Sequence, residues 1–270
     1  MKLSLNQDNY YIMGVLNITP DSFFDGGKYS SIDKIMFRVD EMIREGVDII
    51  DIGGESSRPG SERITIQEEL DRVSPAVSKI RDYYDIPISL DSMKSDVIKE
   101  LLQYDIDIIN DISSLSDPKL IHIMKATNAY ICLMHMHKDP SIMQDNPSYN
   151  NVVQDVMSYL DKKSNFCINN DISPDRIIID PGFGFGKTLD HNYKLLNNLD
   201  KFAEINSNIL VGISRKSMIG NLLNKKLNKR LFGSLSAAVI SIIKHAKIIR
   251  THDVRETKIT IDMIKALFED

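Results

Sequence analysis

The strongest constraint on the fold of this 270-residue chain is a repeated alternation of short apolar runs with longer amphipathic segments. Runs rich in isoleucine and valine predict eight β-strands, over residues 11–16, 47–52, 87–90, 107–109, 129–134, 176–179, 208–213 and 246–249. The amphipathic segments predict helices over residues 32–45, 66–83, 95–102, 118–126, 149–169, 191–199, 231–245 and 254–268. Strands that are apolar on both faces are typical of a parallel sheet covered by helices, and therefore of an α/β fold.

A closed (β/α)₈ barrel is the economical arrangement of eight such units. Dividing 270 residues by eight gives roughly 34 residues per unit, close to one βαβ repeat. No linker rich in proline, glycine or serine divides the chain, so we expect one barrel domain over residues 1–270 with a lead segment over residues 1–10. An open doubly wound sheet is the alternative, but its glycine-rich turn after the first strand is missing.

The composition excludes several classes of partner. A net charge of −5 gives no overall cationic field for nucleic acid. No apolar run approaches the ~18 residues of a membrane span, so we expect no membrane partner. The two cysteines, Cys132 and Cys167, form no C-x-x-C pair. We therefore expect neither a disulfide nor structural zinc, and a cytoplasmic location.

Polar side chains follow almost every predicted strand, and in a barrel these positions share one mouth. Asp91, Asn110 and Asp180 would bring two carboxylates and an amide there. Such groups suit a planar heterocycle with an amidine-like edge, such as a pterin or a purine. Either aspartate alone would fit a helix N-cap equally well, but the three together favour a ligand.

A second set of strand exits is cationic and comprises Arg58, Lys216, Arg250 and His252. Phosphate sites in barrels favour the last two strand exits and a nearby helix N-terminus. A single one of these residues would most often be a solvated surface charge, whereas their convergence predicts a pyrophosphate site.

The run that ends in Gly186, Lys187 and Thr188 is similar to a phosphate-binding P-loop. The match fails because Pro181 stands where that motif requires glycine. We instead expect the glycines to let the backbone approach a flat ligand, with Phe183 and Phe185 supplying apolar surface and at least one of these rings in the core.

His135 and His137 form an H-x-H pair that would suit a transition metal in a hydrolase. The other histidines are scattered, which disfavours that alternative. A Mg²⁺ ion held partly by ligand phosphates needs only one or two protein oxygens, so the sequence permits one.

The blocks at these exits resemble the bacterial dihydropteroate synthases along nearly the whole chain. They cover residues 13–22, 51–60, 91, 109–111, 133–136, 180–186, 212–217 and 250–253. The resemblance implies a TIM-barrel transferase of folate biosynthesis. It would condense 6-hydroxymethyl-7,8-dihydropterin pyrophosphate with p-aminobenzoate by dissociative, SN1-like substitution. It also implies Mg²⁺, a homodimer and a target of sulfonamides.

The resemblance further implies roles for individual residues. The catalytic groups would be Asp91, Asp180, Lys216, Arg250 and His252. Pterin would contact Asp91, Asn110, Met134, Asp180, Lys216 and Arg250. Pyrophosphate would contact Asn17, Arg58, Arg250 and His252, with Mg²⁺ at Asn17. The p-aminobenzoate side would comprise Ser57, Arg58, Pro59, Phe185 and Ser214.

Two loops, over residues 21–27 and 55–61, have the composition of mobile segments, and we expect pyrophosphate to order them. Ser57 stands where the family more often has threonine, which leaves the response to sulfonamides open. Phe24 and Thr251 are further departures. A non-catalytic pterin-binding paralogue and a pterin-dependent methyltransferase domain are the alternatives, but neither explains the pyrophosphate-side residues.

Overall fold

The computed structural model describes residues 3–5, 9–19, 31–56, 60–137 and 143–268. Its strands are β1 (Tyr11–Asn17), β2 (Ile49–Gly53), β3 (Ile88–Asp91), β4 (Ile108–Asp111), β5 (Tyr130–Met134), β6 (Ile177–Asp180), β7 (Leu210–Val211) and β8 (Ile248–Thr251). They form one parallel sheet in the order β6-β5-β4-β3-β2-β1-β8-β7. An isolated bridge between Ile179 and Ile209 joins its two ends. The (β/α)₈ barrel is therefore confirmed and the open sheet was wrong.

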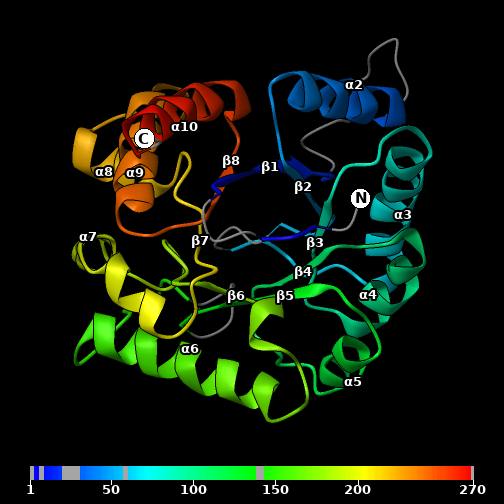
Figure 1. Ribbon diagram of the computed structural model, residues 1–270, viewed down its shortest axis with the longest axis horizontal. Coiled ribbons are helices and arrows are strands. Elements are labelled where there is room, and N and C mark those ends of the chain that lie inside the picture. The colour runs from blue at the N-terminus through cyan, green and yellow to red at the C-terminus, as the bar shows by residue number, and fades with distance from the viewer. Residues whose placement is uncertain (1–2, 6–8, 20–30, 57–59, 138–142, 269–270) are drawn as a thin grey trace.

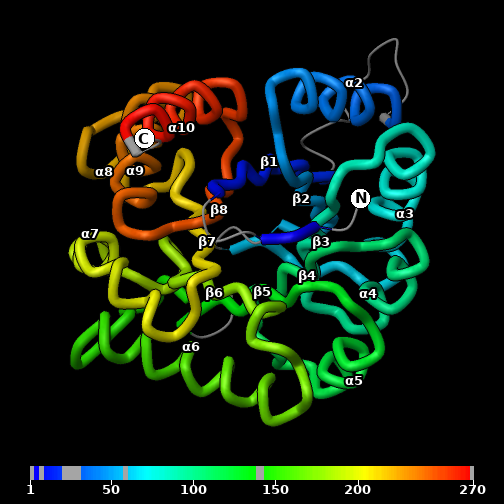
Figure 2. Tube along the Cα trace, in the orientation of Figure 1, coloured from blue at the N-terminus to red at the C-terminus, as the bar shows by residue number. Residues whose placement is uncertain are grey.

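Helices surround this sheet in chain order, as Figures 1 and 2 show. The predicted ones are α2 (Ser31–Arg44), α3 (Ile66–Tyr83), α4 (Ser95–Leu101), α5 (Lys119–Lys125), α6 (Val152–Ile168), α7 (Leu189–Asn197), α9 (Leu231–Ile243) and α10 (Val254–Phe268). Short 3₁₀ turns are η1 (Leu102–Tyr104), η2 (Pro174–Arg176), η3 (Leu199–Glu204) and η4 (Leu227–Lys229). The pattern missed α8 (Ser217–Leu223), because seven residues with a glycine inside give little periodicity.

The barrel interior has an apolar lower half and a polar upper half. One residue from each of several strands fills the lower half: Met13, Ile49, Ile108, Cys132, Ile178, Leu210 and Ile248. Leu3 and Leu5 pack against this layer, so residues 3–5 cover the amino end of the barrel. Side chains alternate along a strand, so the residue two positions later points inward again, nearer the carboxyl end. Those positions include Asp51, Asn110, Asp180 and Arg250.

The outer core lies between the sheet and the helices and consists almost entirely of aliphatic side chains. This shell fixes the strand ends from outside, because densely packed interiors resist displacement. Within the described residues, no helix is long and apolar enough to cross a membrane. Cys132 and Cys167 are both buried and unpaired, as expected.

Candidate active site

The polar upper half of the barrel is organised around the guanidinium of Arg250, which lies between two carboxylates. Its Nε donates to Oδ2 of Asp51 at 2.6 Å and its Nη2 donates to Oδ2 of Asp91 at 2.9 Å. Asp51 is fully buried and also accepts hydrogen bonds from Ser89 at 2.6 Å and from Asn110 at 3.3 Å. Arg250, Asp51, Asp91 and Asn110 therefore belong to one hydrogen-bond network.

The charges in this network perturb one another. Burial and the neighbouring Asp51 raise the pKa of Asp91 to about 7, against the opposing effect of Arg250. Burial alone would lower the pKa of Arg250, but the two carboxylates raise it overall. Arg250 is therefore a permanent cation, whereas the charge of Asp91 changes near neutral pH.

Asp51 is the functional residue that the sequence reasoning missed. It lies inside an apolar run, two residues after the inward-facing Ile49, and was considered only as part of a motif. A signal was present, because a carboxylate within a fully buried strand requires a buried partner. The identity of that partner, Arg250, follows only from closure of the barrel.

A second pair, Asp180 and Lys216, lies on the opposite side of the mouth. The Asp180 carboxylate accepts from the backbone N–H of Gly182 at 2.7 Å, and burial raises its pKa while Lys216 opposes the rise. Burial lowers the pKa of Lys216 to about 8, although Asp180 acts against this. The Lys216 ammonium donates to the Phe183 carbonyl and lies 4.4 Å from the centroid of the Phe185 ring. Lys216 thus presents a positive charge against an aromatic face.

The two phenylalanines of the glycine-rich turn have different environments. Phe183 is completely buried and belongs to the core, whereas Phe185 is partly exposed at the mouth. The expectation that at least one ring lies in the core is therefore confirmed. Met134 ends β5 beside Asp180, with which it is paired in register, and its buried thioether supplies an apolar surface next to the carboxylate.

His252 and Ser214 meet at the exits of the last two strands. The Ser214 hydroxyl lies 3.1 Å from Nδ1 of His252 and accepts from the His252 backbone N–H at 3.2 Å. Burial, followed by the positive charge of Arg250, lowers the pKa of His252 to about 4. The sequence reasoning treated His252 as a cation, and this was wrong: at pH 7 the imidazole is neutral and acts through hydrogen bonds.

Asn17, at the end of β1, is half-buried in a hollow of about 560 Å³ that it shares with Arg38, Arg215 and His252. Within the described part of the chain, no cluster of three or more histidine, cysteine or acidic side chains has the geometry of a metal site.

Several predicted positions lie outside the described residues. These are Ser57, Arg58 and Pro59 of the p-aminobenzoate side, and the whole of the first loop, residues 21–27, including Phe24. The structure describes both flanks of the second loop. Arg63 pairs there with Glu55 at 3.0 Å, and Lys94 bridges Glu55 to Glu69.

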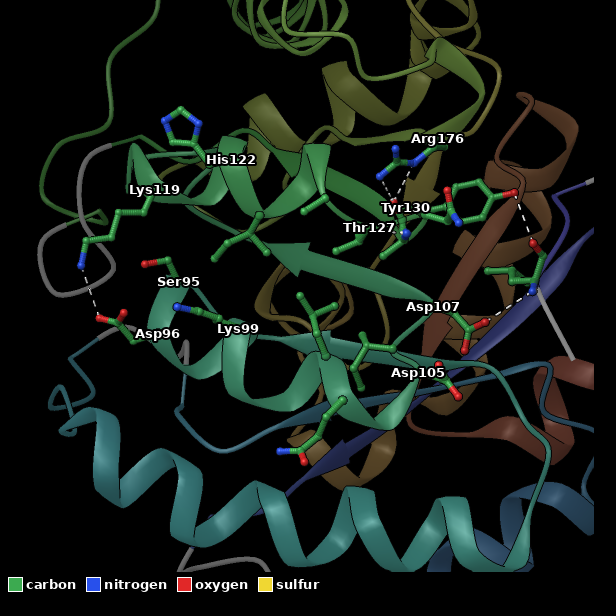
Figure 3. Close-up of a pocket in the computed structure, with 18 of the residues that line it drawn as sticks. Ser95, Asp96, Lys99, Asp105, Asp107, Lys119, His122, Thr127, Tyr130 and Arg176 are labelled. Carbon is green, nitrogen blue, oxygen red and sulfur yellow. Dashed lines mark hydrogen bonds and ion pairs between the residues drawn. The ribbon is translucent and has the colours of Figure 1, made fainter.

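A hollow of about 1250 Å³ lies elsewhere, on the outer wall between α4 and α5 (Figure 3). Its charged side chains find partners beside them, such as Lys119 with Asp96 at 3.6 Å, and Arg176 with the Ala129 carbonyl at 2.7 Å. Asp107 in this groove is likewise held by protein groups, because its carboxylate accepts from the Arg81 guanidinium at 2.8 Å and from the Ile88 backbone N–H at 3.0 Å. We take the mouth, where Arg250, Asp51 and Asp91 meet, as the candidate active site.

Comparison with known proteins identifies the family of the chain. Residues 13–252 match the family model described as pterin binding enzyme. A dihydropteroate synthase from Haemophilus influenzae is 47% identical over 254 residues, covering 94% of this chain and 91% of that protein.

Solved structures agree. The Yersinia pestis dihydropteroate synthase in a sulfonamide drug complex superposes with a TM-score of 0.93 at 40% identity, covering 99% of this chain and 98% of that one. The Xanthomonas albilineans enzyme in complex with 7,8-dihydropteroate gives a TM-score of 0.89 at 31% identity, covering 98% and 96% of the two chains.

Proposed function

This chain belongs to the pterin-binding enzymes and, among them, to the dihydropteroate synthases, and we propose how its own residues carry out that transfer. The reaction joins 6-hydroxymethyl-7,8-dihydropterin pyrophosphate to p-aminobenzoate and releases pyrophosphate. The single observation that carries the proposal is the Arg250 guanidinium held between the buried Asp51 carboxylate and the partly buried Asp91 carboxylate, with Asp180 and Lys216 opposite.

The pterin ring is bound by the polar layer of the barrel. Asp180 accepts hydrogen bonds from the amidine-like edge of the ring, and Lys216 donates to a ring acceptor. Asn110 and Asp91 complete the polar rim, and Met134 packs against the apolar part of the ring. Arg250 lies against a ring face, in an orientation that its two carboxylate partners hold fixed.

Catalysis consists of helping the leaving group to depart. The C–O bond breaks with its electron pair going to pyrophosphate, and the positive charge left on the pterin methylene is offset by Asp91 and Asp180. Arg250 stabilises the departing anion, and neutral His252, held by Ser214, donates a hydrogen bond to it. The lone pair of the p-aminobenzoate amine then forms the C–N bond, and the proton that this nitrogen loses goes to the released pyrophosphate.

The p-aminobenzoate ring occupies the side of the mouth formed by Phe185 and Ser214, with Ser57, Arg58 and Pro59 contributing from the second loop. Phe185 excludes water that would otherwise capture the pterin cation. Sulfonamides bind in the same place, which the sulfonamide complex of the Yersinia pestis relative supports. Inhibition that is competitive with p-aminobenzoate is the expected result.

A Mg²⁺ ion fits this exit, because the Asn17 amide provides a hard oxygen donor in an open hollow next to His252. When bound, the ion would neutralise charge on the pyrophosphate. The Asn17→Ala variant is expected to raise the Mg²⁺ concentration that half-saturates pyrophosphate binding about fivefold, the equivalent of ~1 kcal/mol. Calorimetry of pyrophosphate binding at graded Mg²⁺ measures this without turnover.

We also propose a homodimer formed through α9 and α10, in a cytoplasmic protein whose two cysteines stay reduced. The exposed fractions of Phe232, Ile243, Ile259, Met263 and Leu267 lie between 58% and 80%, a concentration of apolar surface typical of an interface. Phe232→Asp is expected to give a monomer in sedimentation, whereas Phe37→Asp, at a 66% exposed site on α2, leaves the dimer intact. A wild-type protein that sediments as a monomer contradicts the proposed interface.

The decisive experiment measures release of pyrophosphate that depends on both substrates and on Mg²⁺. Turnover supports the proposal. Binding of the pterin substrate without product formation would instead favour the non-catalytic paralogue. Transfer of a methyl group from a pterin would favour the methyltransferase alternative.

A further inference from the structure

Lys187 is a buried lysine to which neither the family resemblance nor the proposed mechanism assigns a role. Its side chain is only 4% exposed. It belongs to the run that is similar to a P-loop, and its partner His135 belongs to the histidine pair that suggested a metal. The structure brings these two unexplained motifs together.

The Lys187 ammonium lies at the centre of a ring of acceptors. Its Nζ lies 2.9 Å from the carbonyl of Gly182, 3.1 Å from that of Phe185 and 3.2 Å from that of His135. It also lies 3.0 Å from Nδ1 of His135. An ammonium group has three donors, so these acceptors satisfy it completely. Burial lowers the pKa of Lys187 well below its usual value, and the neighbouring Asp180 carboxylate opposes this by favouring the charged form.

The turn that surrounds this ammonium depends on glycine at three positions. Gly182, Gly184 and Gly186 all have positive φ, between +64° and +81°. A Cβ at position 182 would approach the His135 carbonyl oxygen to 1.9 Å, so no other residue fits there. Glycines permit this shape but do not hold it, because they lose more conformational entropy on ordering than other residues. The Lys187 side chain, which is hydrogen-bonded to the carbonyls of Gly182, Phe185 and His135, supplies the conformational constraint that the glycines lack.

The backbone that follows Lys187 is held in place by the hydrogen bonds that cap helix α7. Thr188 is the N-cap of α7, where its hydroxyl accepts from the His191 backbone N–H at 3.2 Å, and His191 accepts in return from the Thr188 N–H. Asn192, from the same helix, accepts from the Gly184 N–H at 2.7 Å. The Lys187 side chain therefore extends from the capped start of α7 back into the turn of residues 181–187.

The turn carries two groups of the active site. The Phe183 carbonyl accepts from Lys216, and the Phe185 ring lies under the same ammonium. We propose that Lys187 is a positioning residue that closes the turn of residues 181–187 from inside and thereby fixes Phe185 for p-aminobenzoate. This inference rests on the role proposed above for Phe185.

The test is the variant Lys187→Met, which keeps the length of the side chain and removes the ammonium. KM for p-aminobenzoate is expected to rise about tenfold, while KM for the pterin substrate changes less than about threefold, because the displaced group is Phe185. The matched control is Lys194→Met on α7, whose side chain is 61% exposed and which is expected to behave as wild type.

A double-mutant cycle with Phe185→Ala separates positioning from a general loss of structure. In that background Lys187→Met is expected to change KM for p-aminobenzoate less than about twofold. Effects that simply multiply, or equal increases in KM for both substrates, overturn the proposal. If Lys187→Met does not fold, Lys187→Gln, which keeps a polar side chain but has no ammonium, replaces it under the same criteria.

A measurement independent of turnover keeps this inference distinct from the proposed function. Amide hydrogen exchange at residues 184 and 185 is expected to be about tenfold faster in Lys187→Met than in Lys194→Met. Unchanged exchange overturns the positioning role even in an active enzyme. An inactive wild-type protein with faster exchange in the variant contradicts only the proposed function.

Discussion

The barrel mouth and the groove between α4 and α5 are both hollow and both lined by charged side chains, yet they differ in how those charges are arranged. In the groove, Lys119 and Asp96 form an ion pair while 68% and 53% exposed. At the mouth, Arg250 and Asp91 form one at 20% and 13% exposure, and Asp51 is fully buried. Water screens the first pair, whereas the second interacts strongly with whatever enters beside it.

The difference shows that convergence and desolvation mark a site better than the size of a hollow. The groove has about 1250 Å³, but its ion pair between Lys119 and Asp96 is exposed and joins the neighbouring helices α5 and α4. At the mouth, the paired charges come from strands far apart in the sequence. Preorganised charges in a dry environment stabilise a developing charge most effectively.

The largest effect is expected for Arg250→Ala, which removes the ion pairs that distinguish the mouth from the groove. This variant leaves the carboxylates of Asp51 and Asp91 without their cation, so the free energy of unfolding should fall by about 3 kcal/mol. The value of kcat/KM for the pterin pyrophosphate is expected to fall about 10³-fold. Thermal melts and initial rates measure both effects. Arg255→Ala, at an exposed position of α10, is the control, and equal stability of the two variants would argue against the buried triad.

Asp51→Asn tests the residue that only the tertiary structure identified. The amide no longer holds Arg250 by charge, so kcat/KM is expected to fall about 10²-fold. Steady-state kinetics beside Asp71→Asn, an exposed site on α3, measures the loss. Activity within about threefold of wild type would mean that Asp91 alone orients Arg250.

The pH dependence sharpens the comparison further. Below a pH of about 7 Asp91 gains a proton and loses its negative charge, and above a pH of about 8 Lys216 loses its positive charge. The pH profile of kcat/KM for the pterin substrate is therefore expected to be bell-shaped, with kcat/KM falling about tenfold per pH unit on either side of its maximum. These apparent values belong to the coupled cluster.

The acidic side of this pH profile is expected to shift in a defined direction when Asp51 is replaced. Since Asp51 raises the pKa of Asp91, Asp51→Asn should move this limb to lower pH. A flat profile between pH 5.5 and 9, or a limb that moves upward, would contradict the assignment.

The smallest effects belong to the groove. Lys99→Ala and His122→Ala are expected to change kcat/KM less than about twofold, and Lys119→Ala to change stability by at most about 1 kcal/mol, since these side chains are exposed. Rates and melts measured alongside Arg250→Ala complete the series. A loss of activity comparable to that of Asp51→Asn would mean that the groove contributes to function.

Much of this arrangement was readable from the pattern of residues. All strand ends lie within two residues of prediction, and β7 is shorter than predicted because only Leu210 and Val211 pair with β8. Asp91 and Asp180 are the last residues of their strands, and Asn110 and Arg250 are the residues before the last. The neutral state of His252 was not predictable, because it depends on burial beside Arg250.

The sequence by itself determined the alternation of strands and helices, the barrel, and which strand exits carry ionisable groups, because these follow from local periodicity and order along the chain. Only the tertiary structure decided which of these groups touch. Arg250 and Asp51 are 199 residues apart, and their contact exists because the sheet closes with β8 beside β1. The surroundings of Lys187 were decided in the same way. Its carbonyl partners are those of His135, just after β5, and of Gly182 and Phe185, in a turn whose backbone shape the sequence permits but does not specify.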